Sequence, residues 1–361
     1  MTAAVWARRA CSQSSIGLVL LLPALVAGLA LDAPPATGEW ERLVAAIAPD
    51  AAAPRSLAAD GFARSFVAAV TEVPSSPSPA AHDVLGTARM AQILGVLGIT
   101  MLSYLVVMQS GGRARALLAT LWFAVLPPIA VTGHVLRPET ASVLFALLSL
   151  VLLQCLAANE RPSSRTGTAT MLALCLTASV ATACAVATTP SAGIVLLVPG
   201  GAAMAASGQV ALRMGRTLRQ RSVAVWPARA AAARMWPWVL SSVASIVATI
   251  LVMEGSVQAP EALLPSASIV RLLPQTPWLS WPMSALAVLG AVRLVLRTGQ
   301  RLGRRGRLGA DMLLLIYVAA MLLQRLLRAP LEDALPATMP LALLLADGAI
   351  YAFLLLARRA R

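Results

Sequence analysis

Runs of apolar residues recur along the whole chain and are separated by polar connections. Each run is about 17 to 21 residues long, which lets an α-helix cross the roughly 30 Å hydrocarbon core of a membrane. The runs cover residues 15–31, 90–108, 116–134, 140–157, 169–188, 191–207, 236–253, 280–297, 310–324 and 340–357. The pattern predicts an all-α polytopic transmembrane bundle of about ten spans, with residues 1–361 forming a single integral membrane domain.

The runs at 169–188 and 191–207 are the least regular. The sequence "TTPSAG" separates them, and "VPGG" interrupts the second. Because Pro and Gly often end helices, the two runs fit either two separate spans or one broken re-entrant pair. Both interpretations stay open at this point.

One connection, residues 32–88, is much longer than most others. Within it, two groups of apolar residues recur at helical spacing with charged residues between them. The groups are Trp40, Leu43, Val44 and Ile47, and Phe62, Phe66 and Val70. We expect two amphipathic helices lying on the membrane surface, followed by the linker "VPSSPSPAAHD".

Composition excludes a soluble globular protein. Hydrophobic residues make up 58% of the 361 residues and charged residues only 12%, whereas soluble domains average about 45–50% apolar. The net charge of +14 raises the question of a nucleic-acid partner. Nucleic-acid binding requires a clustered basic face, which this chain lacks, and we expect no such partner.

The charges instead follow membrane topology. Arginines gather at both chain ends and in alternate connections, whereas most carboxylates lie in residues 32–88. Because basic connections stay in the cytoplasm, we expect both termini there, residues 32–88 outside, and insertion in the cytoplasmic (inner) membrane. Arg8 and Arg9 before an apolar core ending in "AGLALDA" are also compatible with a cleaved signal peptide. We favour a retained first span, since it keeps every Arg-rich connection on one side.

The cysteines predict little chemistry. Cys11, Cys155, Cys175 and Cys184 lack metal-like spacing, and buried thiols within spans behave as small hydrophobic groups. We expect no disulfide, no metal and no other cofactor.

A family resemblance rests on residues 86–153, "GTARMAQILGVLGITMLSYLVVMQSGGRARALLATLWFAVLPPIAVTGHVLRPETASVLFALLSLVLL". The features are an Arg before the second span, a Tyr near its end, a Gly and Arg turn, a Pro-terminated span, and an Arg with an acidic residue before the fourth. They fall at Arg89, Tyr104, "GGRAR", Pro127 with Pro128, and Arg137 with Glu139. This stretch resembles the GT-C superfamily of polytopic glycosyltransferases, particularly the bacterial protein-mannosyltransferase-like and aminoarabinose-transferase-like group.

The resemblance implies transfer of a sugar from a polyprenyl-phosphate donor to an acceptor on the outer face of the membrane. In such proteins a carboxylate after the first span acts as general base, because the acceptor hydroxyl must lose its proton as it attacks. Here "GEWERL" aligns best with Gly38 at the family's Asp position and Glu39 at its Glu position. Glu39 is the first candidate base, Asp32 the second and Glu41 the third; Glu39 and Glu41 are equally explained as acids that favour a helix start.

The resemblance also implies arginines that hold the departing lipid phosphate. Arg137 and Arg89 would bind it, with Glu139 orienting the donor or a neighbouring loop and His134 assisting proton transfer. Other outward-facing arginines that could complete the pocket are Arg271, Arg325 and Arg328. Each residue also has a structural explanation: Pro138 and Glu139 start a helix well, arginines reach lipid headgroups, and a lone His is often structural.

Two further acids lie in or beside late spans. An ionisable residue inside a span is costly, and the small neighbours of Asp347 predict a hydrogen bond to another helix. Asp311 begins the ninth predicted span, where the helix dipole favours an acid.

Three functions remain open. The first is the glycosyltransferase just described, with a lipid-linked sugar donor and membrane lipids as partners. The second is a non-catalytic GT-C-like subunit of a larger membrane complex, which Gly38 and the missing Lys-Pro-Pro stretch of many relatives favour. The third is a transporter or flippase, for which Asp347 and "TTPSAGIVLLVPGG" are the only indications.

Overall fold

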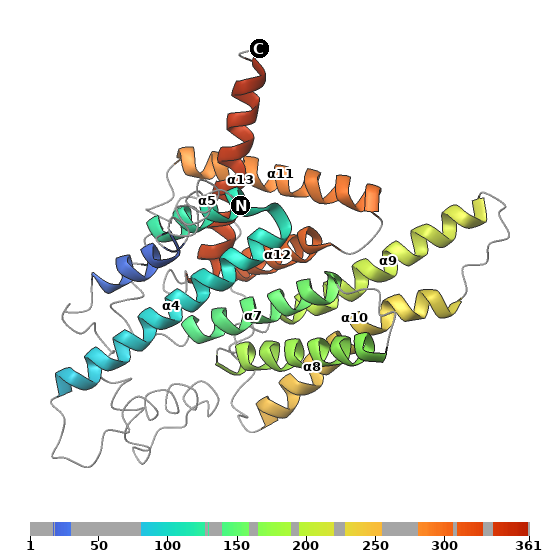
Figure 1. Ribbon diagram of the computed structural model, residues 1–361, viewed down its shortest axis with the longest axis horizontal. Helices are drawn as coiled ribbons and strands as arrows, with labels where there is room; N and C mark the ends of the chain where they lie inside the picture. Colours follow the sequence, from blue (N-terminus) through green and yellow to red (C-terminus); the bar gives the residue numbers. More distant parts are fainter. Residues whose placement is uncertain are drawn as a thin grey trace, which may run out of the picture.

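The computed structural model describes residues 17, 19–29, 81–126, 129, 139–158, 165–188, 195–219, 228–254, 281–305, 309–327 and 335–359. The helices are α4 (Ala81–Gly111), α5 (Arg113–Val125), α7 (Glu139–Ala158), α8 (Arg165–Thr188), α9 (Leu197–Arg219), α10 (Ala228–Glu254), α11 (Trp281–Arg305), α12 (Ala310–Leu327) and α13 (Leu335–Arg359). A shorter helix covers residues 19–28. The described residues contain no strand, which confirms the all-α prediction (Figure 1).

Five helical segments are long and apolar enough to cross a membrane: residues 89–111, 140–158, 167–188, 282–300 and 338–357. Residues 19–28, 235–251 and 310–323 form shorter apolar helices. The count of about ten spans therefore stays a prediction. The two expected surface helices, near residues 40–47 and 62–70, lie outside the described residues.

Within the predicted span 116–134, helix α5 ends at Val125. Leu126 is extended, with φ −70° and ψ 130°. A residue before proline is pushed out of the helical region by the proline ring, and Pro127 follows directly. The apolar run marks the hydrocarbon depth, whereas the Pro pair decides where the helix ends.

The helices pack in a continuous chain of neighbours. α7 packs against α4 and α8, α10 packs against α8 and α9, and α13 packs against α5 and α11. α12 contacts α4, α7, α9, α11 and α13, so it joins the two halves of the bundle (Figure 1). At the irregular runs the structure has two separate helices, α8 of 24 residues and α9 of 23 residues. Of these two, α8 meets the length and hydropathy of a span.

Small hydroxyl side chains join α8 to its neighbours. Ser149 Oγ and Thr182 Oγ1 share a hydrogen bond of 2.7 Å between α7 and α8. On the same interface, Ser142 Oγ donates to Ala185 O at 2.8 Å. Because lipid tails are as apolar as leucine, helix association in a membrane depends on close packing and on hydrogen bonds of this kind.

The backbones of α11 and α13 approach each other very closely. A Cβ added to Gly290 would lie 1.9 Å from Leu344 O, and one added to Gly348 would lie 1.9 Å from Leu286 O. No side chain fits at either position, so the two backbones touch. The contact is reciprocal, because each glycine faces the carbonyl of a leucine on the other helix. We call this contact the glycine crossing (Figure 1, where α11 passes across α13).

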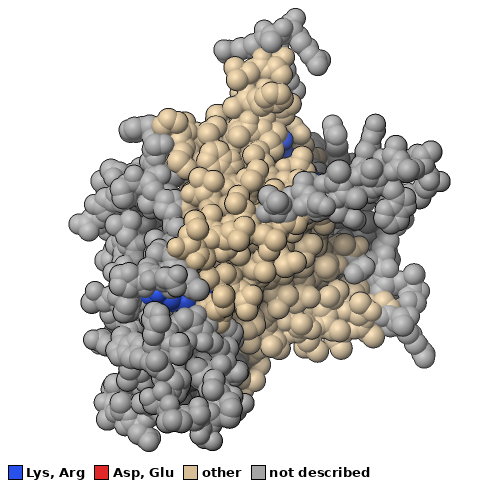
Figure 2. Space-filling view, turned by 60° about the vertical axis from the view of Figure 1, so that its left-hand side comes forward, with Lys and Arg blue, Asp and Glu red and all other residues tan. Residues whose placement is uncertain are grey.

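The outside of the bundle is strongly apolar. In Figure 2 the described surface is tan almost everywhere, with blue basic groups visible at two places. Exposed large side chains occur on most helices and include Leu25, Val125, Met204, Leu251 and Phe353, each more than 60% exposed. A lipid environment explains this surface, since a soluble protein rarely exposes apolar area on this scale.

Candidate functional site

Three segments that are distant in the sequence meet around the first half of α4. A Cβ added to Gly28, near the end of the first described helix, would lie 3.8 Å from Ile93 Cδ1 of α4. On α4, a Cβ added to Gly95 would lie 2.7 Å from Thr140 Cγ2, at the start of α7. The end of the first helix and the start of α7 therefore both lie within about one turn of Ile93. We call this meeting point the α4 junction.

Arg89 lies one turn before Ile93 at the α4 junction. Its side chain is only 2% exposed, and it engages other groups of the protein. A guanidinium carries five donors in a planar fork that suits a phosphate or a carboxylate. Arg89 is therefore a buried cation beside the segments that the sequence selects for substrate binding.

The other predicted site residues are described in part or not at all. Glu139 is the first residue of α7 and Arg325 lies in the last turn of α12, and only their backbone is described. The remaining seven lie outside the described residues: Asp32, Glu39, Glu41, His134, Arg137, Arg271 and Arg328. Their roles stay predictions. The glutamate at position 139 is helical, as the sequence predicts for the residue after Pro138.

A second charged group lies elsewhere in the bundle and was only partly predicted. Arg115 of α5 binds Asp347 of α13 with two parallel hydrogen bonds, Nε to Oδ1 at 2.7 Å and Nη2 to Oδ2. Arg115 Nη1 also donates to Ser110 Oγ at 2.9 Å. The side chains of Arg115 and Asp347 are 2% and 1% exposed. This confirms that Asp347 is held by another helix.

Asp311 and two arginines of α11 extend this group. Asp311 Oδ1 lies 3.8 Å from both Arg115 Nη1 and Arg297 Nε. Arg297 Nη2 donates to Ser110 O at 2.7 Å, and Arg293 Nη1 donates to Asp347 O at 3.2 Å. We call these five charged residues the charge cluster: Arg115, Arg293, Arg297, Asp311 and Asp347. It joins α5, α11, α12 and α13 at the end of the bundle where α4 turns into α5.

The turn between α4 and α5 is built to admit Arg115. A Cβ added to Gly111 would lie 2.1 Å from Arg115 Cδ, so only glycine leaves room for the arginine stem. Gly112 has φ +87°, a conformation that favours glycine. The "GGRAR" motif therefore has a structural reason: two glycines let the chain turn and let the second arginine fold back into the bundle.

A narrow crevice lies between α4, α5 and α13. Its lining includes Thr100, Ser103, Thr120, Phe123 and Met339. Its free volume of about 10 Å³ is close to the minimum for one water molecule. Ser103 Oγ is buried and, among the described residues, has no hydrogen-bond partner, so the crevice suits a water and is too small for a sugar.

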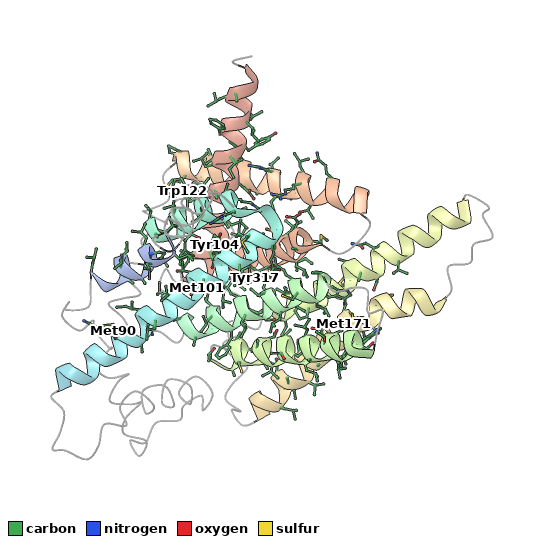
Figure 3. All side chains as sticks on the ribbon, viewed as in Figure 1. Met90, Met101, Tyr104, Trp122, Met171 and Tyr317 are labelled. Carbon is green, nitrogen blue, oxygen red and sulfur yellow. The ribbon has the colours of Figure 1, made fainter. Side chains whose placement is uncertain are left out.

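Two buried tyrosines lie near the centre of the bundle (Figure 3). Tyr104 of α4 corresponds to the tyrosine of the family resemblance and is 8% exposed. Tyr317 of α12 is fully buried, and its hydroxyl has no hydrogen-bond partner in the described part of the chain. Tyr104 is about four turns along α4 from Arg89, so it lies away from the α4 junction.

Within the described ranges, no three His, Cys, Asp or Glu residues are grouped so that they could hold a metal ion. The described chemistry is therefore that of arginines, two aspartates and hydroxyl groups. The α4 junction offers a buried cation, and the charge cluster offers both cations and carboxylates.

Comparison with known proteins supports the fold. No protein-family model matches the sequence, and no curated protein matches it. Solved structures of the oligosaccharyltransferase from the archaeon Archaeoglobus fulgidus do match. The apo form and the complex of AglB with an inhibitory peptide and a dolichol-phosphate each align at a TM-score of 0.55, and the complex with Zn and sulfate aligns at 0.51.

The alignments cover almost all of this chain but only part of the other. In the first two structures they include 95% of this chain and 51% of the oligosaccharyltransferase, at 13% sequence identity. The chain therefore spans about half the length of the protein it resembles. At this identity the likeness shows the fold alone, a helical bundle like that of the oligosaccharyltransferase.

Proposed function

We propose that this chain transfers a sugar from a polyprenyl-phosphate-linked donor to an acceptor at the outer face of the membrane. The observation that carries the proposal is the α4 junction, where the first helix, the buried Arg89 and the start of α7 meet. The oligosaccharyltransferase fold supports lipid-linked sugar transfer in general, since one solved complex of that protein contains a dolichol-phosphate.

Chain connectivity links Asp32, the second candidate base, to the α4 junction. Asp32 follows Leu29, the last described residue of the first helix, by three residues. An extended chain covers at most about 3.6 Å per residue, so Asp32 stays within about 11 Å of Leu29. Glu39 and Glu41 follow within the same segment. In the proposed mechanism, Glu39 accepts the proton of the acceptor hydroxyl as that oxygen attacks the sugar.

Connectivity also links the candidate phosphate ligands. Arg137 precedes Glu139, the first residue of α7, by two residues, which limits their separation to about 7 Å. Thr140, the next residue, contacts Gly95 on α4, less than two turns after Arg89. In the proposal, Arg89 and Arg137 together bind the donor phosphate and stabilise its charge as the sugar departs.

The test is a transfer assay with the purified full-length chain, a synthetic polyprenyl-phosphate sugar and candidate acceptors. Glu39→Gln, Asp32→Asn and Glu41→Gln are compared with Glu160→Gln, a matched control in a connection predicted to face the cytoplasm. Loss of a general base lowers the rate by about 10²–10⁴-fold, and we expect this loss for Glu39→Gln. Full activity in all three variants would refute the assigned base.

A second function is a non-catalytic subunit of a larger membrane complex. It is favoured by Gly38, which stands where the family resemblance places an aspartate. This function predicts no transfer and no donor hydrolysis with any polyprenyl-phosphate sugar, together with stoichiometric purification with other membrane proteins from native membranes.

A further inference from the structure

The charge cluster contains more positive than negative charge. Its arginines are Arg115, Arg293 and Arg297, and its carboxylates are Asp311 and Asp347. Both oxygens of Asp347 bind Arg115, while Asp311 lies 3.8 Å from Arg115 and Arg297. Arg293 donates to the backbone carbonyl of Asp347 at 3.2 Å and forms no ion pair with any described carboxylate. By formal charge, the five residues of the cluster carry three positive and two negative charges.

Further arginines follow toward the end of α11. Arginines occur at positions 293, 297, 301 and 304, a spacing of four, four and three residues that places them on one face of the helix. At 1.5 Å per residue this face extends over about 17 Å. It begins inside the candidate span 282–300 and continues beyond it. We call these four positions the arginine stripe.

Next to the arginine stripe, the outward side of the same helix is apolar and exposed. Val288 is 61% exposed, and Val292, Val295 and Leu296 are each about half exposed. In Figure 1 the second half of α11 extends past its crossing with α13. One helix thus carries a row of four arginine positions beside exposed aliphatic side chains, at the boundary of a candidate membrane-spanning segment.

These two rows match the two parts of an anionic phospholipid. We propose that the arginine stripe binds the headgroup phosphate of an anionic phospholipid, whose acyl chain lies along Val292, Val295 and Leu296. Guanidinium groups form paired, charge-assisted hydrogen bonds with phosphate, and basic pockets between helices on the cytoplasmic side bind such headgroups. The positive excess of the cluster selects an anionic lipid over a zwitterionic one. This proposal does not depend on sugar transfer.

The position of Arg293 follows from the glycine crossing. Gly290 lies one turn before Arg293, and Gly348 follows Asp347 directly. Because the backbones touch at the two glycines, the guanidinium of Arg293 reaches the Asp347 carbonyl from α11. The carbonyl fixes one edge of this guanidinium, and its remaining donors are the ones we assign to the lipid phosphate.

The test uses the purified full-length chain in detergent with phosphatidylglycerol, phosphatidylcholine or inorganic phosphate. Native mass spectrometry measures retained lipid, and thermal unfolding measures stabilisation. We expect phosphatidylglycerol to be retained and to raise the melting temperature, and the other two to do neither. Equal effects of phosphatidylcholine would overturn the anionic selectivity, and equal effects of inorganic phosphate would overturn the assignment to a lipid.

Variants locate the site. Arg293→Gln and Arg301→Gln are each expected to weaken phosphatidylglycerol binding about fivefold, as for one arginine near a membrane surface. Arg219→Gln, at the end of α9, removes the same charge outside the stripe and is the matched control. Arg301→Gln lies outside the charge cluster, so it tests the stripe even where Arg293→Gln disturbs folding. An equal loss in Arg219→Gln, or no loss in Arg301→Gln, would refute the proposal.

Discussion

At the residue scale, the Arg115–Asp347 pair is a buried ion pair with two parallel hydrogen bonds. Both side chains are almost fully buried, and the carboxylate receives two hydrogen bonds from one guanidinium. A buried ion pair contributes little net stability compared with apolar residues, but removing one partner leaves an uncompensated charge. The pair is therefore better understood as a requirement for correct helix docking than as a source of stability.

This pair gives a prediction for stability. Asp347→Ala leaves Arg115 buried without its carboxylate, and we expect a loss of about 3–5 kcal/mol in the free energy of unfolding. Arg115→Met combined with Asp347→Ala should lose less than the sum of the single changes, because the two residues are coupled. Thermal or denaturant unfolding in detergent measures all three. Additive losses would show that the pair is not coupled.

Arg89 gives a prediction for activity. Arg89→Lys keeps the charge but loses the paired donors, and Arg89→Gln loses both. If Arg89 binds the donor phosphate, the KM for the donor should rise about tenfold in Arg89→Lys and about a hundredfold in Arg89→Gln. Arg113→Gln, at the start of α5, is the control. Unchanged donor KM in both Arg89 variants, with normal melting temperatures, would exclude this role.

The sequence predicts some of these residues and not others. Asp347 requires a partner because an ionisable group within a span is costly, and this expectation is confirmed. Its partner is Arg115, which is 232 positions away. The sequence does not distinguish Arg115 from the many other arginines near span ends, because helix packing decides which of them reaches Asp347. The cluster around the pair was missed for the same reason.

At the element scale, the glycine crossing holds α11 and α13 together. Gly290→Ala and Gly348→Ala would each place a methyl group 1.9 Å from a backbone carbonyl oxygen. The helices must then separate, and we expect a destabilisation of at least about 1–3 kcal/mol, as for overpacked cores. Loss of the Arg293 contact with Asp347 O should accompany it.

Gly299 supplies the matched control, since it lies in α11 and a Cβ there would meet nothing within 4 Å. Gly299→Ala should be neutral or stabilise the helix by up to about 1 kcal/mol, because alanine has the higher helix propensity. The measurement is thermal unfolding of the three variants in one detergent. Equal melting temperatures for Gly348→Ala and Gly299→Ala would contradict the close contact.

Helix positions could be predicted from apolar runs, but their ends could not. α4 begins at Ala81 and α13 at Leu335, before the apolar runs that start at 90 and 340. α9 continues to Arg219, well past the run ending at 207. Apolar length reflects the thickness of the hydrocarbon core, whereas these helices continue into the sequence beyond it. The early end of α5 before Pro127 is the opposite case.

At the scale of the whole molecule, the placement of arginines predicts the orientation in the membrane, and the apolar runs predict a helical bundle. The all-helical, GT-C-like fold expected from residues 86–153 agrees with the oligosaccharyltransferase alignment over 95% of the chain. The candidate base could not be tested in the same way, because Asp32, Glu39 and Glu41 lie outside the described residues. Orientation stays a prediction, since the helices alone do not distinguish the two sides of a membrane.

Cysteine labelling tests the orientation. After replacement of the four native cysteines, Ser75→Cys in residues 32–88 should react with a membrane-impermeant maleimide added to intact cells. Ser222→Cys, between α9 and α10, should react only after the membrane is opened, because Arg-rich connections stay in the cytoplasm. The reverse labelling pattern would invert the orientation and would place the α4 junction on the cytoplasmic side.

The ion pair between Arg115 of α5 and Asp347 of α13 also affects how the chain is inserted during synthesis. Arg115 enters the bilayer early in synthesis, but Asp347 is added more than two hundred residues later. Until then the arginine lies in or beside lipid without its counter-ion, where an isolated charge is costly. Early helices must therefore remain loosely associated, shielded by water, headgroups or an insertion factor, until translation of α13. A nascent chain halted before α13 should accordingly be a substrate for membrane proteolysis.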